Sequence, residues 1–292
     1  MSETVTEFAP AKVNLTLRVG GPRGDGYHPL QSVTVFADIG DDIMVKPADA
    51  LGLSVDGANA PELAAEPKNL ALKAAYALRA AAQRSELGAE IRLTKRLPVA
   101  AGLGGGSADA AACLRALNRL WDLDFSNRQL AEIGTVIGAD VPACVFAKPL
   151  MMSGIGETIT PLMAWPDLYA VIANPGVAVS TADVFKTYDG QKPGALASER
   201  APALAKFGDV IAYLQGSAND LEKPAIALAP QVAECLRALE QFQDAGLVRM
   251  SGSGASCFAV FEHKTQADDA ANALSDQQPD WWVQSVKLSG VS

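Results

Sequence analysis

The chain of 292 residues is 49% apolar and 20% charged, a composition typical of soluble globular proteins, and its length fits one large or two medium domains. Its 24 Lys and Arg residues against 33 Asp and Glu residues give a net charge of −9. With no Lys/Arg-rich run, this balance argues against duplex nucleic acid as a partner. Any phosphate site must therefore obtain its positive charge locally.

Four scattered cysteines and two histidines indicate no zinc site, because no C-x-x-C pair is present. We expect the cysteines to be small buried residues of a reducing compartment. The first residues, MSETVTEFAPAK, lack the basic and apolar regions of a signal peptide. No apolar stretch of about 18 residues suggests a membrane span. We therefore expect a cytoplasmic protein without membrane contact.

The first expected element is a half-buried strand at 11–19, AKVNLTLRV, because apolar and polar residues alternate along it. Lys12 and Asn14 fall on its polar face. The next segments are expected as a Gly/Pro-rich loop at 20–30, strands at 31–46 and 51–55, a helix at 69–84 with Asn69 as its N-cap, and a strand at 89–97 that Pro98 ends.

The remaining elements mix helices and strands without a regular βαβ rhythm, which predicts an α+β protein. We expect helices at 107–120 and 127–137, a turn with a short helix at 138–146, a strand within 165–176, a helix at 181–188 and a loop at 190–206. A helix at 230–244, two short strands around 251–256, a helix at 265–275 and a last strand at 281–288 follow. A domain boundary is expected near 160–165.

Residues 102–109 read GLGGGSAD and come directly before a good helix. A tight turn would need one or two glycines, not four. A dinucleotide fingerprint fails because Ser107 stands at its third glycine, and a P-loop fails because no Lys follows the glycines. A phosphate-binding loop fits best, since glycines let the unpaired N–H groups of a helix start approach an anion. Ser107 can cap that helix or ligate a phosphate-bound metal ion.

Two charged residues near this loop are ambiguous. Lys95 shares a strand face with Ile91, Leu93 and Leu97, so it either extends to solvent at the strand end or faces the phosphate site. Asp109 would stabilise the helix dipole but repel a phosphate nearby. We therefore expect Asp109 to point away from the phosphate or to meet a metal ion.

Three segments together resemble the GHMP kinase superfamily, which includes homoserine, mevalonate and galactose kinases. They are PAKVNLTLRVGGPRGDGYHPLQSV (10–33), LPVAAGLGGGSADAAA (97–112) and RMSGSGASCFAVF (249–261). The resemblance implies an α+β fold with an N-terminal mixed α/β domain (1–164), a C-terminal ferredoxin-like domain (165–292) and an active site in the cleft between them. One departure is Ala100 and Ala101, where such kinases often have glycines.

The segment AKVNLTLRV followed by GDGYHPLQSV narrows the resemblance to members that phosphorylate the 2-hydroxyl of a cytidine-diphosphate-linked methylerythritol in non-mevalonate isoprenoid synthesis. The resemblance thus implies ATP, a divalent ion such as Mg²⁺ and a small-molecule cytidyl substrate. Monomer and homodimer both remain open. Another small-molecule GHMP kinase and a non-catalytic nucleotide-binding protein are the alternatives.

By this resemblance Lys12 and Asp140 are the catalytic residues. Lys12 would stabilise negative charge on the attacking oxygen, and Asp140 would accept the hydroxyl proton. The residues alone favour other roles, a solvated strand lysine and a helix cap before Pro142. The resemblance places nucleotide binding at Asn69, Lys95, Pro98, Val99, Ala100, Ala101, Gly102, Leu103, Gly104, Gly105, Gly106, Ser107 and Ala108.

Recognition of the cytidyl group is expected from an aromatic stacking face and polar groups at the edge of the base. Tyr27 and Phe185 can stack, and His28 can hydrogen-bond through its ring or backbone, although a surface loop and a helix core would also explain these residues. Thr181 and Asn14 complete the expected substrate-binding set. The turn SGSGAS (251–256) would shape the site near substrate or phosphate, or act only as a tight turn.

Overall fold

The computed structural model describes residues 4–60, 69–197 and 199–289. The chain forms two compact units whose segments alternate along the sequence. The first unit takes residues 1–12, 39–99 and 104–147, and the second takes 13–38, 100–103 and 148–292. The division falls within strands β1 (Val5–Asn14) and β3 (Leu30–Pro47). The sequence domains expected at 1–164 and 165–292 stay a prediction.

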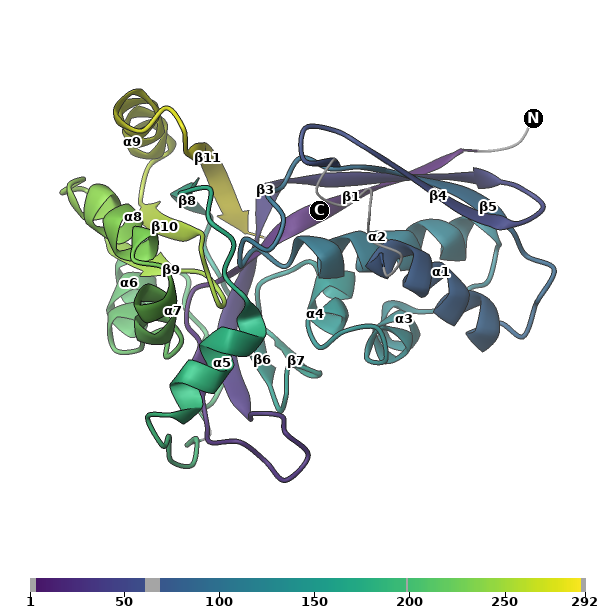
Figure 1. The fold of residues 1–292 in the computed structure, drawn as a ribbon, viewed down its shortest axis with the longest axis horizontal. Helices are drawn as coiled ribbons and strands as arrows, with labels where there is room; N and C mark the ends of the chain where they lie inside the picture. The colour runs from purple at the N-terminus through teal and green to yellow at the C-terminus, as the bar shows by residue number, and fades with distance from the viewer. Residues whose placement is uncertain (1–3, 61–68, 198, 290–292) are drawn as a thin grey trace. The chain divides into compact units, whose positions relative to one another are not determined.

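The first unit packs helices against one face of a sheet (Figure 1). Strand β5 (Ala89–Thr94) pairs antiparallel with the second half of β3 and parallel with β4 (Leu51–Asp56). The helices are α1 (Leu70–Ala81), α2 (Gly105–Leu120), α3 (Asn127–Gly134) and α4 (Val141–Phe146). Helices α1 and α2 pack through small buried side chains, which include Ala71 and Ala74 of α1 and Ala108 and Ala111 of α2.

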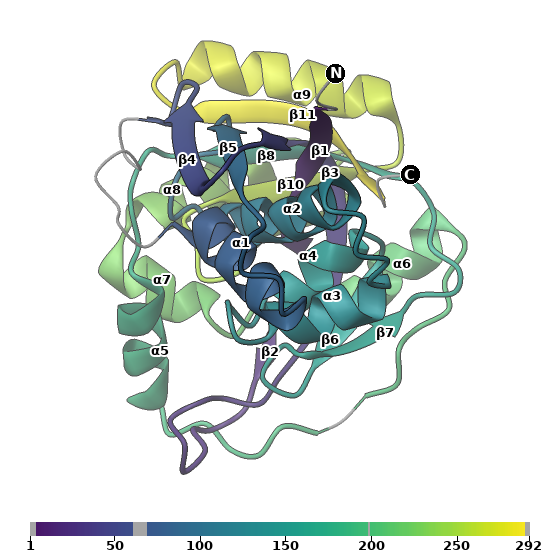
Figure 2. The ribbon, with the colours of Figure 1, turned by 90° about the vertical axis from the view of Figure 1, so that its right-hand side faces the viewer.

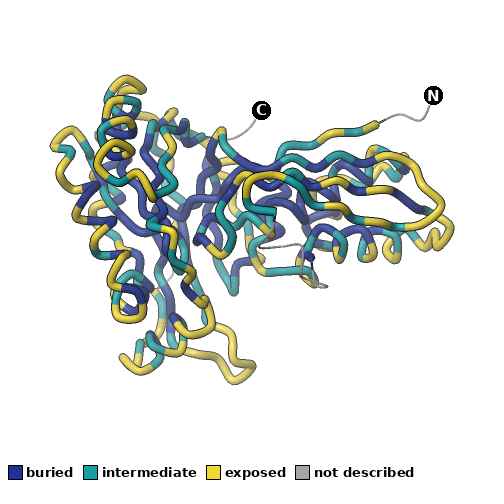
Figure 3. The backbone as a smooth tube through the Cα atoms, turned by 45° about the horizontal axis from the view of Figure 1, so that its top comes forward, coloured by how far each residue is buried: buried dark blue, intermediate teal, exposed yellow. Residues whose placement is uncertain are grey.

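The second unit contains an antiparallel sheet in the order β3–β11–β8–β10–β9. Its strands, besides the first half of β3, are β2 (Arg18–Val19), β6 (Leu150–Ser153), β7 (Thr158–Pro161), β8 (Leu168–Asn174), β9 (Leu247–Met250), β10 (Cys257–Phe261) and β11 (Trp282–Ser289). Strands β6 and β7 form a hairpin beside β3. All five residues of β10 are buried, so this strand belongs to the core. Figure 3 shows the buried parts of the backbone in dark blue and the exposed parts in yellow.

Five helices belong to the second unit. They are α5 (Thr181–Asp189), α6 (Phe207–Gln215), α7 (Glu222–Leu228), α8 (Gln231–Glu240) and α9 (Lys264–Gln277). Helix α9 runs along β11, and α8 packs on β9 and β10 (Figure 2). These helices bury Val232, Leu239 and Leu274 against the sheet.

Most expected elements are present, with two informative differences. The strand at 11–19 was expected to be half-buried, but Lys12, Asn14 and Thr16 are all buried, so the expectation of a solvated polar face is wrong. The alternation reflects a strand with protein on both faces, one of them polar. The strand expected at 89–97 ends at Thr94, which places Lys95 just beyond it.

The sequence did not lead us to expect β6, β7, α6 and α7. The hairpin strands have only four residues each, below the length at which periodicity is informative. Helix α7 contains Pro224, which is tolerated because it lies in the first turn, where the missing N–H has no intrahelical partner. Lys206 precedes α6 and provides no side-chain cap that would mark its start.

Two expectations from composition concern the described residues. Cys113, Cys144, Cys235 and Cys257 are all buried and form no disulfide. Within the described ranges, no helix combines the length and apolar character that crossing a bilayer requires.

Candidate active site

Strand β1 brings the lysine at its polar face to the carboxylate that precedes α4. Lys12 Nζ lies 2.9 Å from Asp140 Oδ2. The Lys12 side chain is 5% exposed and that of Asp140 is 37% exposed. The pair therefore combines a cation fixed in the protein with a carboxylate open to solvent, which can reach a small molecule.

Asp140 does not cap α4. Its backbone is helical, with φ −85° and ψ −15°, and its side chain makes no capping hydrogen bond. The helix-cap interpretation of Asp140 is therefore wrong. Because the carboxylate accepts no N–H at the helix start, capping does not compete with a role as proton acceptor.

Groups of the protein itself occupy the space that three glycines of the 102–106 loop leave open. At Gly102 (φ +75°) a Cβ would lie 2.4 Å from Ser251 O, and at Gly104 (φ +62°) it would lie 3.0 Å from Lys12 Cε. At Gly105 it would lie 2.9 Å from Lys95 Nζ. Positive φ and close approach both require glycine. These three glycines thus have a structural reason that does not involve a ligand.

The start of α2 retains the features of an anion site. Gly104 precedes the helix and offers no side-chain cap, and the first intrahelical bond runs from Ala108 N–H to Gly104 O at 2.9 Å. The N–H groups of Gly105, Gly106 and Ser107 therefore have no intrahelical partner. Helix α2 starts two residues before the expected position, so Ser107 lies inside its first turn and does not cap it. The residues present fit a phosphate group at this position.

The SGSGAS turn fastens the first part of the glycine loop within the second unit. Ser256 N–H donates to Ala101 O at 3.0 Å, and Ser251 Oγ donates to Gly102 O at 3.0 Å. Ser251 Oγ also accepts the Asn14 N–H at 3.2 Å, so one buried hydroxyl links β1 to the loop. The turn therefore does more than reverse the chain, since it determines where residues 101 and 102 lie.

Lys95 forms a fully buried ionic cluster with Asp41 of β3 and Asp109 of α2. Its Nζ donates to Asp41 Oδ2 at 2.5 Å and to Asp109 Oδ2 at 2.8 Å. Asp41 Oδ1 accepts the backbone N–H groups of Arg96 and Leu97 at 2.6 and 2.9 Å. Lys95 is 2% exposed, so the expectation that it extends to solvent is wrong. Asp109 of α2 pairs with the same ammonium that lies 2.9 Å from the position of a Cβ at Gly105, and the expectation that it points away from a phosphate or meets a metal ion stays a prediction.

The cluster contains two carboxylates and one ammonium, so its acidic groups outnumber its basic group. Burial disfavours the charged form of Lys95, but Asp109 and Asp41 outweigh that effect and raise the pKa of Lys95. Burial raises the pKa of Asp109 to about 7, against the opposing effect of Lys95. Asp109 Oδ1 is buried without a hydrogen-bond partner.

A second group of expected residues meets on α5 in the second unit. The rings of His28 and Phe185 lie 4.9 Å apart between centroids, tilted by 39°. His28 Nε2 lies 2.7 Å from Asp189 Oδ1. Tyr27, next along the loop, is 55% exposed, and Thr181 Oγ1 lies 2.8 Å from Ser253 Oγ. The partly buried Phe185 ring therefore serves as both a core neighbour and an aromatic contact.

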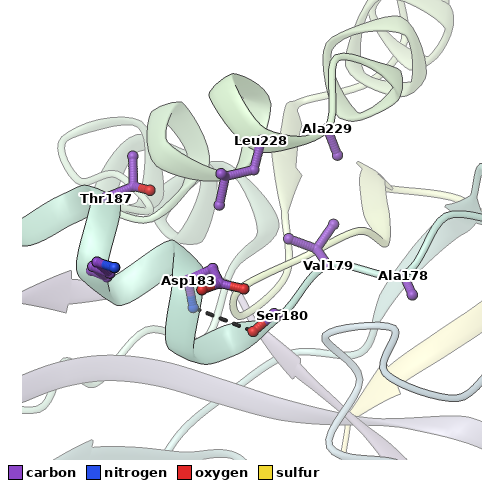
Figure 4. A pocket seen from close by; sticks show the side chains of 8 residues that line it. Ala178, Val179, Ser180, Asp183, Thr187, Leu228 and Ala229 are labelled. Carbon is purple, nitrogen blue, oxygen red and sulfur yellow. Dashed lines mark hydrogen bonds between the residues drawn. The ribbon is translucent and has the colours of Figure 1, made fainter.

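A separate hollow of about 610 Å³ lies on another face of α5 (Figure 4). Asp183 and Thr187 line it, together with Leu228 of α7. Residues four apart share a helix face, so Thr181 and Phe185 form one face and Asp183 and Thr187 another. This hollow is thus distinct from the His28–Phe185 contact.

Comparisons with known proteins agree with the three segments noted in the sequence. Residues 69–148 match the GHMP kinases N terminal domain and residues 197–280 match the GHMP kinases C terminal domain. A 4-diphosphocytidyl-2-C-methyl-D-erythritol kinase of Parvibaculum lavamentivorans is 46% identical, over 99% of this chain and 100% of its own. The chain belongs to the family of 4-diphosphocytidyl-2-C-methyl-D-erythritol kinases.

Other relatives show how far the likeness extends. The kinase of the same name from Dinoroseobacter shibae is 47% identical over 98% of this chain and 96% of its own. A crystal structure of 4-(cytidine 5'-diphospho)-2C-methyl-D-erythritol kinase matches with a TM-score of 0.76 and 34% identity, over 98% of this chain and all of that one. A homoserine kinase from Cytophaga hutchinsonii, 20% identical, shares the fold with a TM-score of 0.70, over all of this chain and 96% of its own.

The expected family and fold are thereby confirmed. The chain is an ATP-using small-molecule kinase with the two-part α+β fold of the GHMP superfamily. Within this kinase, the structure joins Lys12 to Asp140 and His28 to Phe185. It places Asn69 as the N-cap of α1, since Asn69 Oδ1 accepts the Ala71 N–H at 2.9 Å.

Nothing in the sequence pointed to two residues of this kinase, Asp41 and Asp189, which complete the Lys95 and His28 contacts. Ser251 belongs to the turn SGSGAS, for which two roles were open, and it holds the glycine loop. Asp41 lies in GDD within a long strand, where a fully buried carboxylate is unusual, but nothing local indicates its partner 54 residues away. Asn14 lies between two hydroxyls, with Nδ2 donating to Ser32 Oγ at 2.7 Å and Thr34 Oγ1 at 3.3 Å.

Ala100, where such kinases often carry glycine, has a left-handed backbone with φ +51°. Because a Cβ is disfavoured there, we expect Ala100→Gly to raise the free energy of unfolding by about 0.5 kcal/mol. Ala101→Gly is the matched control, because Ala101 is buried and does not have a positive φ. This variant should lower the free energy of unfolding by about 1 kcal/mol. Urea denaturation checks both, and a less stable Ala100→Gly variant would contradict the assignment of strain.

Asp109 gives this kinase a specific pH dependence of stability. Its native pKa near 7 exceeds the ordinary 3.8, so between about pH 4 and 7 the native state keeps a proton that the unfolded state has lost. The free energy of unfolding therefore falls as pH rises through this window. From pH 5 to 8, we expect the wild type to lose about 2 kcal/mol more than Asp109→Asn. The free energy of unfolding of both proteins is measured by urea denaturation across this pH range, and an equal change with pH in the two proteins would refute the prediction.

Proposed function

We propose that this kinase transfers the γ-phosphoryl group of ATP to the 2-hydroxyl of 4-diphosphocytidyl-2-C-methyl-D-erythritol, in the non-mevalonate route to isoprenoid precursors. The observation that carries the proposal is the ion pair of Lys12 Nζ and Asp140 Oδ2, 2.9 Å apart, in which the Asp140 carboxylate is accessible and does not cap α4. A phosphoryl-transfer site needs a positioned acceptor for the hydroxyl proton and a fixed positive charge beside it. The names of the relatives support the identity of the substrate.

In this proposal Asp140 orients the attacking hydroxyl. Its carboxylate accepts a hydrogen bond from that O–H and takes the proton as the oxygen bonds to phosphorus. Lys12 stabilises the negative charge on the attacking oxygen, and its buried position keeps the ammonium in place. Gly104 leaves room for the Lys12 side chain, so the start of α2 and the catalytic pair are held together.

The start of α2 would hold the nucleotide. The N–H groups of Gly105, Gly106 and Ser107 donate to phosphate oxygens, aided by the dipole of a 16-residue helix. We propose that Mg²⁺ accompanies ATP. Ser107 and Asp140 supply hard oxygen donors of the kind that Mg²⁺ prefers, and Ser107 Oγ lies 3.9 Å from the position of a Cβ at Gly138, near Asp140. When bound, the ion would neutralise charge on the transferring phosphoryl group.

The cytosine base would be bound on the second unit. The Phe185 ring offers a stacking face, and exposed Tyr27 can close over a base from the adjoining loop. His28, Thr181 and Asn14 provide polar groups for the rest of the substrate. The unpaired cysteines agree with a cytoplasmic enzyme, which we include in the proposal.

An ADP-release assay on the purified protein tests the proposed function. Parallel reactions with ATP and Mg²⁺ would contain 4-diphosphocytidyl-2-C-methyl-D-erythritol, mevalonate, homoserine or galactose. We expect turnover with the cytidyl substrate alone, and its loss when EDTA removes the metal. Turnover with another alcohol would keep the fold and the catalytic pair but reject the cytidyl pocket.

Removing the charge of Asp140 tests the catalytic pair. We expect Asp140→Asn to lower kcat by about 10³-fold with little change in KM for ATP, because an amide cannot take the proton. Asp124→Asn is the control: Asp124 is exposed and has positive φ, which Asn tolerates well. A kcat within threefold of the wild type in Asp140→Asn would reject the mechanism.

Truncating Phe185 tests base recognition. We expect Phe185→Ala to raise KM for the cytidyl substrate by about tenfold and to leave KM for ATP unchanged, since stacking on a base is worth about 1–3 kcal/mol. Leu228→Ala, an exposed apolar residue across the α5 hollow, should change neither constant. Equal effects on both KM values would indicate damage to the fold instead of a lost contact.

A further inference from the structure

The buried cluster of Asp41, Lys95 and Asp109 has no role in the mechanism above. Lys95 is the basic residue that the sequence offers for phosphate contact beside the glycine loop. Its Nζ instead donates to two carboxylates and is almost completely buried. Direct contact with a phosphate would require both ion pairs to rearrange. The contribution of Lys95 to nucleotide binding must therefore take another form.

The contacts of Lys95 join the first turn of α2 to Asp41. Its Nζ lies 2.9 Å from where a Cβ would stand at Gly105, the first residue of the helix, and 2.8 Å from Asp109, one turn later. Asp41, whose Oδ2 lies 3.8 Å from the same Cβ position, is fixed by two backbone N–H groups at 2.6 and 2.9 Å. The Lys95 ammonium thus links the Asp41 carboxylate, which is held by backbone N–H groups, to the first turn of α2, whose N–H groups have no intrahelical partner.

The net negative charge of this cluster disfavours the binding of a phosphate group at the first turn of α2. When both carboxylates are ionised, one negative charge remains uncompensated, and Asp109 Oδ1 has no partner. Asp109 Oδ2 lies 2.8 Å from Lys95 Nζ, which lies 2.9 Å from the position of a Cβ at Gly105, so this carboxylate is within about 6 Å of the first residue of α2. A negative charge at this distance in a poorly solvated interior weakens the attraction of the helix start for phosphate.

We propose that Lys95 is a positioning residue that acts on the nucleotide through the first turn of α2, and that the carboxylate of Asp109 lowers the affinity of this turn for phosphate. The inference rests on the proposed nucleotide site and deepens it. It makes Asp41, Lys95 and Asp109 determinants of nucleotide affinity that do not touch the nucleotide.

The first test measures ADP binding by calorimetry without metal at pH 8, where Asp109 is ionised, together with KM for ATP and for the cytidyl substrate. We expect Asp109→Asn to lower the Kd of ADP by about fivefold and to lower KM for ATP, with KM for the cytidyl substrate unchanged. Asp42→Asn is the control, because it removes the same charge from the neighbouring strand position, where Asp42 pairs with Arg96 near solvent; it should change Kd less than twofold. An unchanged or raised Kd in Asp109→Asn would overturn the electrostatic part.

The second test is a double-mutant cycle of Lys95→Met and Asp109→Asn. We expect Lys95→Met to raise the Kd of ADP by about tenfold or more, since two unpaired buried carboxylates displace the turn, and by only about threefold in the Asp109→Asn background. If Lys95 touched the nucleotide directly, its loss would cost the same factor in both backgrounds, which would overturn the positioning role. Urea denaturation establishes that each variant is folded. If Lys95→Met does not fold, the double variant is compared with Asp109→Asn: a rise in Kd of about threefold is expected, and a rise of about tenfold or more would overturn the positioning role.

The design separates this inference from the proposed function. Turnover of the cytidyl substrate by the wild type tests the function, whatever the variants do. A wild type that binds ADP and turns over, with Asp109→Asn indistinguishable from it, would reject the inference and keep the function. A wild type that binds no ADP would reject the nucleotide site on which both depend.

Discussion

The packing of protein groups against the glycine-rich loop is the constraint on which the site depends. The Ser251 carbonyl, the Lys12 side chain and the Lys95 ammonium occupy the positions where side chains would stand at Gly102, Gly104 and Gly105. A Cβ at any of them would collide with backbone or with a buried charged group. The glycines thus allow a helix start with free N–H groups to lie directly against charged residues.

Two buried lysines, Lys12 and Lys95, have different surroundings. Each lies on or just beyond a strand and is almost fully buried, and each is paired with carboxylate. The partner of Lys12 is partly exposed, which leaves a reactive group at the surface. Both partners of Lys95 are buried, which leaves a fixed ionic cluster. Burial of the partner, more than burial of the lysine, distinguishes the proposed catalytic pair from the ionic cluster of Lys95.

The residues that we propose for binding of the base and those that we propose for chemistry on the hydroxyl form separate groups. The His28–Phe185 contact lies on α5 in the second unit, whereas Lys12 and Asp140 belong to the first. Such a division fits a superfamily in which one fold serves different alcohols. The homoserine kinase of similar fold shows that the scaffold does not by itself specify a base.

The sequence alone determined the α+β class, the longer helices and strands, the glycine loop and, through the three segments, the kinase family. These properties follow from local periodicity, turn residues and short motifs, which act within a few positions along the chain. Only the tertiary structure decided that Asp140 does not cap α4, that Lys95 is buried between two carboxylates and that the polar face of β1 is buried. It also decided that Asp41, Asp189 and Ser251 contact the predicted site residues. The partners concerned lie far apart in the sequence: His28 and Asp189 are separated by 161 residues, and Asn14 and Ser251 by 237. Burial and ion pairing depend on which segments the fold brings together, and no local pattern contains that information.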